Sequence, residues 1–304
     1  MQAQKVFFII PTYNDFSKLP AICKAIQARG FECVIVDDGS EMDNHLLMKI
    51  SDVFLLRHLQ NLGQGAALQT GMNFAILKEA TVLVHFDADG QHSLHDAFKM
   101  IALLQEEKLD IILGSRFLLK KINTKIPPSR IYTLKAARIF NNWITGMNLS
   151  DAHNGLRVLS KKSAQMINLK QNRMAHASEI IQLIKKHKLL FAEFQTNIFY
   201  SNENHKRKGI IYILNIIWDL LYAKFLERNY SSEFILISLV IFIFACVNLD
   251  NLVLKLIEVV FFVSLLVLLL KYRRAKSKQI YKTNVIRQNA IQNACKVNFY
   301  QKRP

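Results

Sequence analysis

The chain has 304 residues, enough for one large or two modest domains, and a net charge of +17. Residues 111–150 and 271–304 contain Lys and Arg but no acid, which favours a polyanionic partner such as anionic lipid or a phosphorylated substrate. No nucleic-acid motif is present, and the four scattered cysteines lack CxxC spacing, which excludes a typical zinc site or disulfide framework.

Apolar runs and helical stretches alternate through the first 113 residues. Strands are expected at residues 6–10, 33–36, 53–56, 81–86 and 110–113. Helices are expected at residues 16–29, 63–78 and 94–107, with another that ends near residue 50. This order predicts an α/β domain with a mostly parallel sheet and helices on both faces, in which Pro11 ends the first strand. The polar clusters that follow the strands should meet at one edge of that sheet.

The pattern changes after residue 116. Helices are expected at residues 129–146 and 175–187, a short strand up to residue 159, a strand-like stretch at residues 191–200, and a basic loop at residues 201–208. Residues 209–226 are apolar except for a narrow polar stripe, which is typical of a helix in a membrane interface. A core helix of the soluble domain is the alternative.

Two charge-poor apolar runs follow, at residues 234–249 and 252–270. They predict a two-helix transmembrane hairpin, with a re-entrant or interfacial hairpin as the alternative. Basic residues directly after the second run place that end in the cytoplasm, and two spans return the N-terminal domain to the same side, consistent with the absence of a signal-peptide pattern. The expected domains are residues 1–208 (catalytic), 209–230 (interface helix), 231–271 (hairpin) and 272–304 (a basic, disordered cytoplasmic tail).

The most informative motif follows the fourth expected strand, where Asp87 and Asp89 stand one residue apart before Gly90. Two carboxylates at a strand end repel each other unless a cation lies between them and a ligand. Mg²⁺ and Mn²⁺ take one or two carboxylates together with substrate phosphates. The motif therefore predicts a metal–diphosphate site, and an Asp-Gly turn with solvated acids is the alternative.

Other strand ends carry polar groups as well. Asp37 and Asp38 follow the second strand and could accept ribose hydroxyls, or form a turn or helix cap. Gly63 opens a Gly-rich helix start that could meet an anion, although no P-loop or complete dinucleotide motif is present. Arg116 follows the fifth strand and could bind phosphate.

A polar loop begins at Asp151 and leads to Arg157. The two residues could act as a general base and a phosphate clamp, or form an ordinary ion pair. His176 and Glu179 are interpreted as satisfied helix residues rather than a metal pair. The basic run at 205–208 suits lipid headgroups or an acceptor phosphate, with a solvated charge run as the alternative.

Together these motifs resemble a known family. The segments P-T-Y-N, V-D-D-G-S, N-x-G-x-G-A, D-A-D-G-Q-H, G-S-R and D-x-x-x-G-x-R occur here in the order found in family 2 glycosyltransferases of the GT-A fold. The closer likeness is to the dolichyl-phosphate mannose synthase and polyprenyl-phosphate glycosyltransferase branch, over about residues 5–226. The Ser-Lys pair that related enzymes often carry before the interface helix is missing, and no QxxRW signature is present.

The resemblance implies roles for individual residues. The implied catalytic residues are Asp151 and Asp89. The implied nucleotide-sugar site comprises Pro11, Thr12, Tyr13, Asn14, Asp37, Asp38, Gly63, Asp87, Ala88 and Arg116. The implied Mg²⁺ or Mn²⁺ ligands are Asp87, Asp89 and Gln91. The acceptor phosphate would meet Arg157, Lys206, Arg207 and Lys208.

The expected activity is metal-assisted, inverting transfer of a sugar from a nucleotide-diphosphate sugar to a polyprenyl phosphate. A phosphomonoester is largely dianionic at pH 7, so this acceptor needs little general-base help and Asp151 could simply orient it. The alternatives are transfer to a hydroxyl of a lipid-linked saccharide and an inactive sugar-nucleotide-binding membrane scaffold. The expected location is the cytoplasmic membrane, in contact with its lipids, and a homo-oligomer is compatible with the sequence.

Overall fold

The computed structural model describes residues 4–41, 50–118, 138, 142, 145–151, 154–197 and 282–292. The chain divides into two compact units, residues 1–207 with 285–304 and residues 208–284, and the first is described below. The expected interface helix, the expected hairpin and the run Lys206–Lys208 lie outside the described residues. Among the helices that the structure describes, none has both the length and the apolar character needed to span a bilayer.

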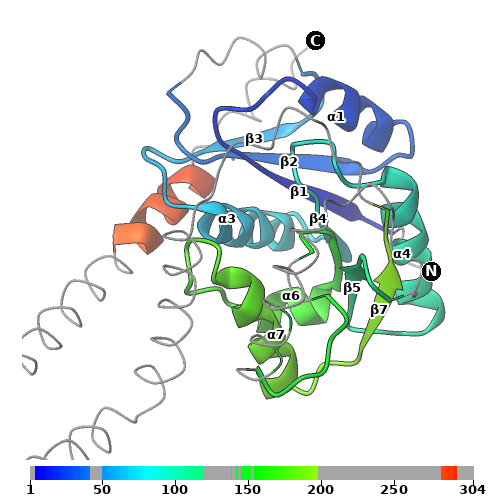
Figure 1. The fold of residues 1–304 in the computed structure, drawn as a ribbon. Coiled ribbons are helices and arrows are strands. Elements are labelled where there is room, and N and C mark those ends of the chain that lie inside the picture. The colour runs from blue at the N-terminus through cyan, green and yellow to red at the C-terminus, as the bar shows by residue number, and fades with distance from the viewer. Residues whose placement is uncertain are drawn as a thin grey trace, which may run out of the picture. The chain divides into compact units, whose positions relative to one another are not determined.

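A seven-stranded sheet forms the centre of the first unit (Figure 1). Its strands are β1 (Val6–Thr12), β2 (Glu32–Asp37), β3 (Phe54–Arg57), β4 (Val82–His85), β5 (Ile111–Ser115), β6 (Arg157–Ser160) and β7 (Phe191–Gln195). They lie in the order β3-β2-β1-β4-β6-β5-β7, and β6 runs antiparallel to both of its neighbours while the other pairings are parallel. The predicted α/β fold with a mostly parallel sheet is therefore confirmed.

Helices pack on both faces of the sheet (Figure 1). They are α1 (Leu19–Gln27), α3 (Gln64–Leu77), α4 (Leu94–Glu106), α6 (Lys161–Met166) and α7 (His176–Lys186). Side chains of a strand alternate between faces, so Phe8 and Val84 join the core under α1 and α4, whereas Ile9 and Leu83 join the core under α3, α6 and α7. The central strands β1 and β2 carry apolar side chains on both faces because both faces are covered.

The first strand continues through Pro11 and Thr12, which pair with Val36 and Asp37, so the expectation that Pro11 ends it is wrong. The carbonyl of Ile9 accepts from Phe86, the residue after β4, and that of Thr12 accepts from the residue after β2, so Pro11 faces the β4 side. The ladder with β4 ends at the Ile9–His85 pair, and the missing N–H of Pro11 therefore costs no strand pairing.

Residues 282–292 form a helix, although the sequence led us to expect a disordered tail there. Ile286, Arg287 and Ala290 are buried on one face of it, at 6%, 6% and 3% exposure. Ile286 clusters with Leu62 and Ala66 at the start of α3. These positions have the spacing of one helix face. A hydrophobicity pattern does not reveal this face, because one of its buried residues is an Arg in a basic segment.

Candidate active site

The polar clusters meet at one edge of the sheet, as predicted. Strands β1, β2 and β4 are parallel, so Thr12, Asp37 and the residues after His85 lie at the same edge. Strand β5 has the same direction as β4, because both are antiparallel to β6 between them. Arg116, directly after β5, therefore joins this edge too.

Asp37 ties the loops after β1 and β2 together. Its Oδ1 accepts the backbone N–H of Ser40 at 3.0 Å and also the Ser40 hydroxyl, and its Oδ2 lies 3.3 Å from Nε of Arg57. Asn14, at φ +52°, donates its N–H to Ser40 Oγ at 2.9 Å. Tyr13 is 44% exposed beside it, so this pair of loops presents a half-open polar surface that could receive a nucleoside.

Asp38 is engaged within the protein. It accepts the N–H groups of Leu62 at 3.0 Å and Gly63 at 2.6 Å, and its Oδ1 lies 2.7 Å from Nδ1 of His58. The Gly-rich helix start does meet an anion, but that anion is Asp38 itself. Direct contact of Asp38 and Gly63 with a nucleotide sugar stays a prediction.

Gly63 cannot be replaced without strain. Its φ is +110°, and a Cβ on it would collide with the backbone carbonyl of Asn172. This carbonyl accepts the N–H of Ala66 at 3.1 Å. The glycine therefore serves a close approach between the start of α3 and a distant loop.

Asp87 lies just beyond β4 and is held from two sides. Its Oδ1 accepts Nε2 of Gln64 at 2.8 Å, and its Oδ2 lies 2.9 Å from Nε2 of His92. Burial alone would raise the pKa of Asp87, but the hydrogen bond from His92 and the charges of His92 and Arg157 outweigh it and lower the pKa. Gly155 leaves room for this carboxylate, since a Cβ there would collide with Oδ2.

Asp89 has the opposite electrostatics. Burial and the nearby charge of Asp87 raise the pKa of Asp89, against the backbone hydrogen bond from Gln91 at 2.9 Å. Two neighbouring carboxylates whose pKa values move apart are typical of a site where like charges cannot both be stable without a cation. Ala88 between them is buried.

The acidic pair fits a Mg²⁺ or Mn²⁺ ion that a diphosphate completes. Within the described ranges, no three His, Cys, Asp or Glu side chains gather closely enough to hold a metal ion by themselves. Two carboxylates and the half-buried Gln91 form an oxygen donor set that suits these ions only when substrate oxygens supply the remaining ligands.

Arg157 and His85 face each other across β6 and β4 under this site. Burial lowers the pKa of Arg157 to about 10, against the charges of Asp87 and Asp151, so Arg157 stays a cation at neutral pH. Burial, followed by the charges of Arg157 and His176, lowers the pKa of His85 well below its usual range, so His85 is neutral. We had not expected His85 in the site. Its position at the end of β4, two residues before Asp87, was the available signal.

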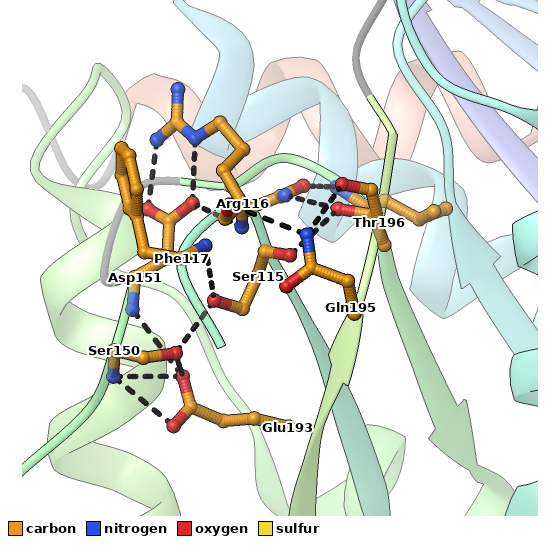
Figure 2. A network of polar contacts seen from close by, with 10 residues as sticks. Ser115, Arg116, Phe117, Ser150, Asp151, Glu193, Gln195 and Thr196 are labelled. Carbon is orange, nitrogen blue, oxygen red and sulfur yellow. Dashed lines mark hydrogen bonds and ion pairs between the residues drawn. The ribbon is translucent and has the colours of Figure 1, made fainter. Parts of the chain in front are cut away.

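Arg116 pairs with Asp151 (Figure 2). Nε and Nη2 of Arg116 donate to the two carboxylate oxygens at 2.6 and 2.7 Å, and the backbone N–H of Arg116 donates to Oδ2 at 3.1 Å. Both side chains are buried, at 8% and 3% exposure. The ion pair that the sequence suggested for Asp151 with Arg157 is thus made with Arg116.

Glu193 was missed in the sequence. From β7 it accepts the backbone N–H of Ser150 at 2.9 Å and the Ser150 hydroxyl at 2.7 Å, and Ser115 Oγ lies 2.6 Å from Ser150 Oγ (Figure 2). The signal was an acid between two apolar residues, Ala192 and Phe194, of the expected strand. The loop that carries Asp151 is therefore fixed from β5 and β7 together.

Comparison with known proteins agrees with the motif order. Residues 7–167, more than half of the chain, match the family model for glycosyl transferase family 2. The chain belongs to glycosyltransferase family 2 and is a glycosyltransferase.

Several similar proteins have assigned activities. The chain is 28% identical, over 74% of its length and 98% of the relative, to UDP-N-acetylglucosamine–dolichyl-phosphate N-acetylglucosaminyltransferase of Methanococcus voltae. It is 26% identical, over 55% of its length and 65% of the relative, to polyprenol monophosphomannose synthase of Mycolicibacterium smegmatis.

A solved structure shares the fold. Glucosyl-3-phosphoglycerate synthase from Mycobacterium tuberculosis, in complex with Mn²⁺, uridine-diphosphate-glucose and phosphoglyceric acid, superposes with a TM-score of 0.55. The sequence identity is 13%, over 73% of this chain and 79% of the other. This likeness establishes the GT-A-like α/β fold.

Proposed function

We propose that the protein transfers a sugar, with inversion, from a nucleotide-diphosphate sugar to a polyprenyl phosphate at the cytoplasmic face of a membrane. One observation carries the proposal: Asp87 and Asp89, with oppositely shifted pKa values, stand at the strand end where a family 2 domain would bind its donor. The names of the two relatives support the donor and acceptor classes.

The donor side combines a nucleoside surface with a metal site. Thr12 and Asp37 end β1 and β2, and Tyr13 follows Thr12, at the edge where a base and ribose would bind. Asp87, Asp89 and Gln91 would hold Mg²⁺ or Mn²⁺, which would supply Lewis-acid stabilisation of the departing diphosphate. His92 and Gln64 orient Asp87, so that the carboxylate is in place before the donor arrives.

The acceptor side calls for cations rather than a base. Arg157 is a buried cation close enough to Asp87 for the two charges to affect each other, which suits a group that receives an anionic acceptor. Asp151 gives both carboxylate oxygens to Arg116, an arrangement that favours orientation over proton transfer. A dianionic phosphate needs no proton removed, and it is the acceptor that agrees with such an Asp151.

Membrane attachment is proposed from the sequence. The apolar runs at 234–249 and 252–270, followed by the basic run at 271–278, suit a hairpin anchor, and the basic run at 205–208, directly before the expected interface helix, suits an anionic lipid acceptor. The interface helix at 209–230 would keep the catalytic domain at the headgroup level.

The test is to incubate membranes that contain the full chain with radiolabelled sugar nucleotides and polyprenyl phosphate, with and without EDTA. We expect one sugar nucleotide to give a lipid-phase product that requires both the polyprenyl phosphate and a divalent metal. A product formed on a saccharide without polyprenyl phosphate, or no transfer with any sugar nucleotide, would overturn the proposal.

A further inference from the structure

Arg287 is a buried cation far in sequence from every motif of the site. Its helix, residues 282–292, places Ile286 against Leu62 and Ala66, a cluster separate from the two large cores. Arg287 itself is 6% exposed. Burial lowers the pKa of Arg287 to about 10, against the charges of Glu179 and Asp38, so it is still charged at neutral pH. A charge is buried at such a place only where hydrogen bonds compensate for lost water.

The guanidinium binds one loop, residues 169–172. Nη1 donates to the carbonyl of Leu169 at 3.3 Å, and Nη2 donates to Oδ1 of Asn172 at 3.1 Å. The loop is also held from α3, where Gln69 Oε1 accepts the N–H of Leu169 at 2.6 Å, and from α7, where Glu179 accepts the N–H of Lys170 at 2.9 Å. Arg287 is thus the third support of a loop that two helices already hold.

This loop in turn packs against the first turn of α3. The carbonyl of Asn172 accepts the N–H of Ala66, and the loop carbonyls approach Gly63 and Gly65 so closely that a Cβ on either glycine would collide. The same turn of α3 enters the site at two points. Gln64 donates to Asp87 Oδ1 at 2.8 Å, and the N–H of Gly63 binds Asp38 at 2.6 Å.

We propose that Arg287 is a positioning residue for donor binding, which holds the 169–172 loop against the start of α3 and so keeps Gln64 on Asp87. The inference rests on the proposed function for its ligand, a nucleotide-diphosphate sugar with its metal. It also assigns a role to the C-terminal segment: residues 282–292, which follow the two apolar runs in the sequence, complete the support of the donor site.

The experiment uses the full chain in detergent, as wild type, Arg287→Met, Arg287→Lys and the control Gln288→Met, an exposed position on the same helix. Hydrogen exchange is measured first, because it needs no ligand. We expect faster exchange in Arg287→Met at residues 62–66 and 169–172, with β1 and β4 unchanged. Arg287→Lys keeps the charge but loses the planar fork, so it should lie between wild type and Arg287→Met. Unchanged exchange at 62–66 would overturn the inference, even if no nucleotide bound to the wild type.

Kinetics then separate positioning from loss of fold. Arg287→Met should raise the donor KM about tenfold, the size expected for a residue that orients a ligand-binding group, with the acceptor KM unchanged. In a Gln64→Ala background the same substitution should change the donor KM much less, because the hydrogen bond from Gln64 to Asp87 is already absent. Equal loss in both backgrounds, or equal change in both KM values, would mean that Arg287 only stabilises the fold.

Discussion

Two acidic sites lie at the same sheet edge and differ in how their charge is compensated. The charge of Asp151 is compensated within the protein, because Arg116 donates two side-chain hydrogen bonds and one backbone hydrogen bond to its carboxylate. Asp87 receives a neutral amide and one imidazole, and the side chain of Asp89 accepts a backbone N–H. The Asp151 carboxylate is therefore neutralised by a paired guanidinium, whereas in the other site the charges of His92 and Arg157 lower the pKa of Asp87 but leave the pKa of Asp89 raised, which favours an external cation.

The largest effect is expected from Asp89→Asn. An amide has no negative charge with which to bind a divalent cation. The transition state should therefore lose several kcal/mol of stabilisation, and the rate of metal-dependent transfer should fall roughly 1000-fold or more. Transfer is measured at saturating Mn²⁺, with Asp52→Asn, at an exposed position, as the control. Full activity in Asp89→Asn would remove the basis of the metal assignment.

Breaking the internally neutralised site should affect stability. Arg116→Met leaves the Asp151 carboxylate buried without its cation and should lower the free energy of unfolding by roughly 3–5 kcal/mol. The matched control is Lys162→Met, which removes an ion pair to Asp110 whose Lys is 61% exposed and should cost at most about 1 kcal/mol. Denaturant unfolding measures both. The double variant Arg116→Met/Asp151→Asn should recover part of the lost stability. Equal losses in Arg116→Met and Lys162→Met would show that the two ion pairs do not differ.

Substitution of His92 tests whether the Asp87 carboxylate must be oriented to bind the metal. His92→Ala removes the hydrogen bond to Asp87 Oδ2 and should weaken Mn²⁺ binding in the presence of nucleotide by about 10–100-fold. Calorimetric titration gives the affinity. His95→Ala, at an exposed position on α4, is the control. An unchanged affinity would mean that Asp87 does not need this partner.

Asp151→Asn distinguishes the two acceptor types with a smaller effect. With a phosphate acceptor, kcat/KM should fall about tenfold or less and the pH profile should keep its shape. Loss of a general base for a hydroxyl acceptor would cost about 10²–10⁴-fold and remove the acid limb of the profile. The larger loss would favour transfer to a lipid-linked saccharide.

The smallest effect concerns metal-free stability. Because the pKa of Asp89 is raised in the folded state, the folded protein holds more protons than the unfolded chain between the two pKa values, and stability falls as pH rises through that window. Asp89→Asn should therefore slightly raise Tm near pH 7, and the difference should vanish in acid. Asp87→Asn should lower Tm near pH 7, because the pKa of Asp87 is lowered. Thermal melts in EDTA would contradict this if both variants lowered Tm equally.

Much of the fold was predictable because strand alternation is a local property. Apolar runs that end in Asp37, Asp87 and Gly114-Ser115-Arg116 indicated buried parallel strands and the edge that they share, and the structure agrees. The last strand was expected to reach residue 200 but ends at Gln195. Pro11 was misjudged because its cost depends on which side its missing N–H faces, which only the sheet order decides.

The sequence by itself determined the α/β class, the family and the acidic pair after β4, because each follows from periodicity or from residues a few positions apart. The tertiary structure decided which charges meet. Arg116 finds Asp151 across 35 positions, Ser150 finds Glu193 across 43, and Arg287 finds Leu169 across 118. The fold decides which loops and helices lie together, and so which of these residues meet. The role of a buried charge can be inferred only when its hydrogen-bond partners are known.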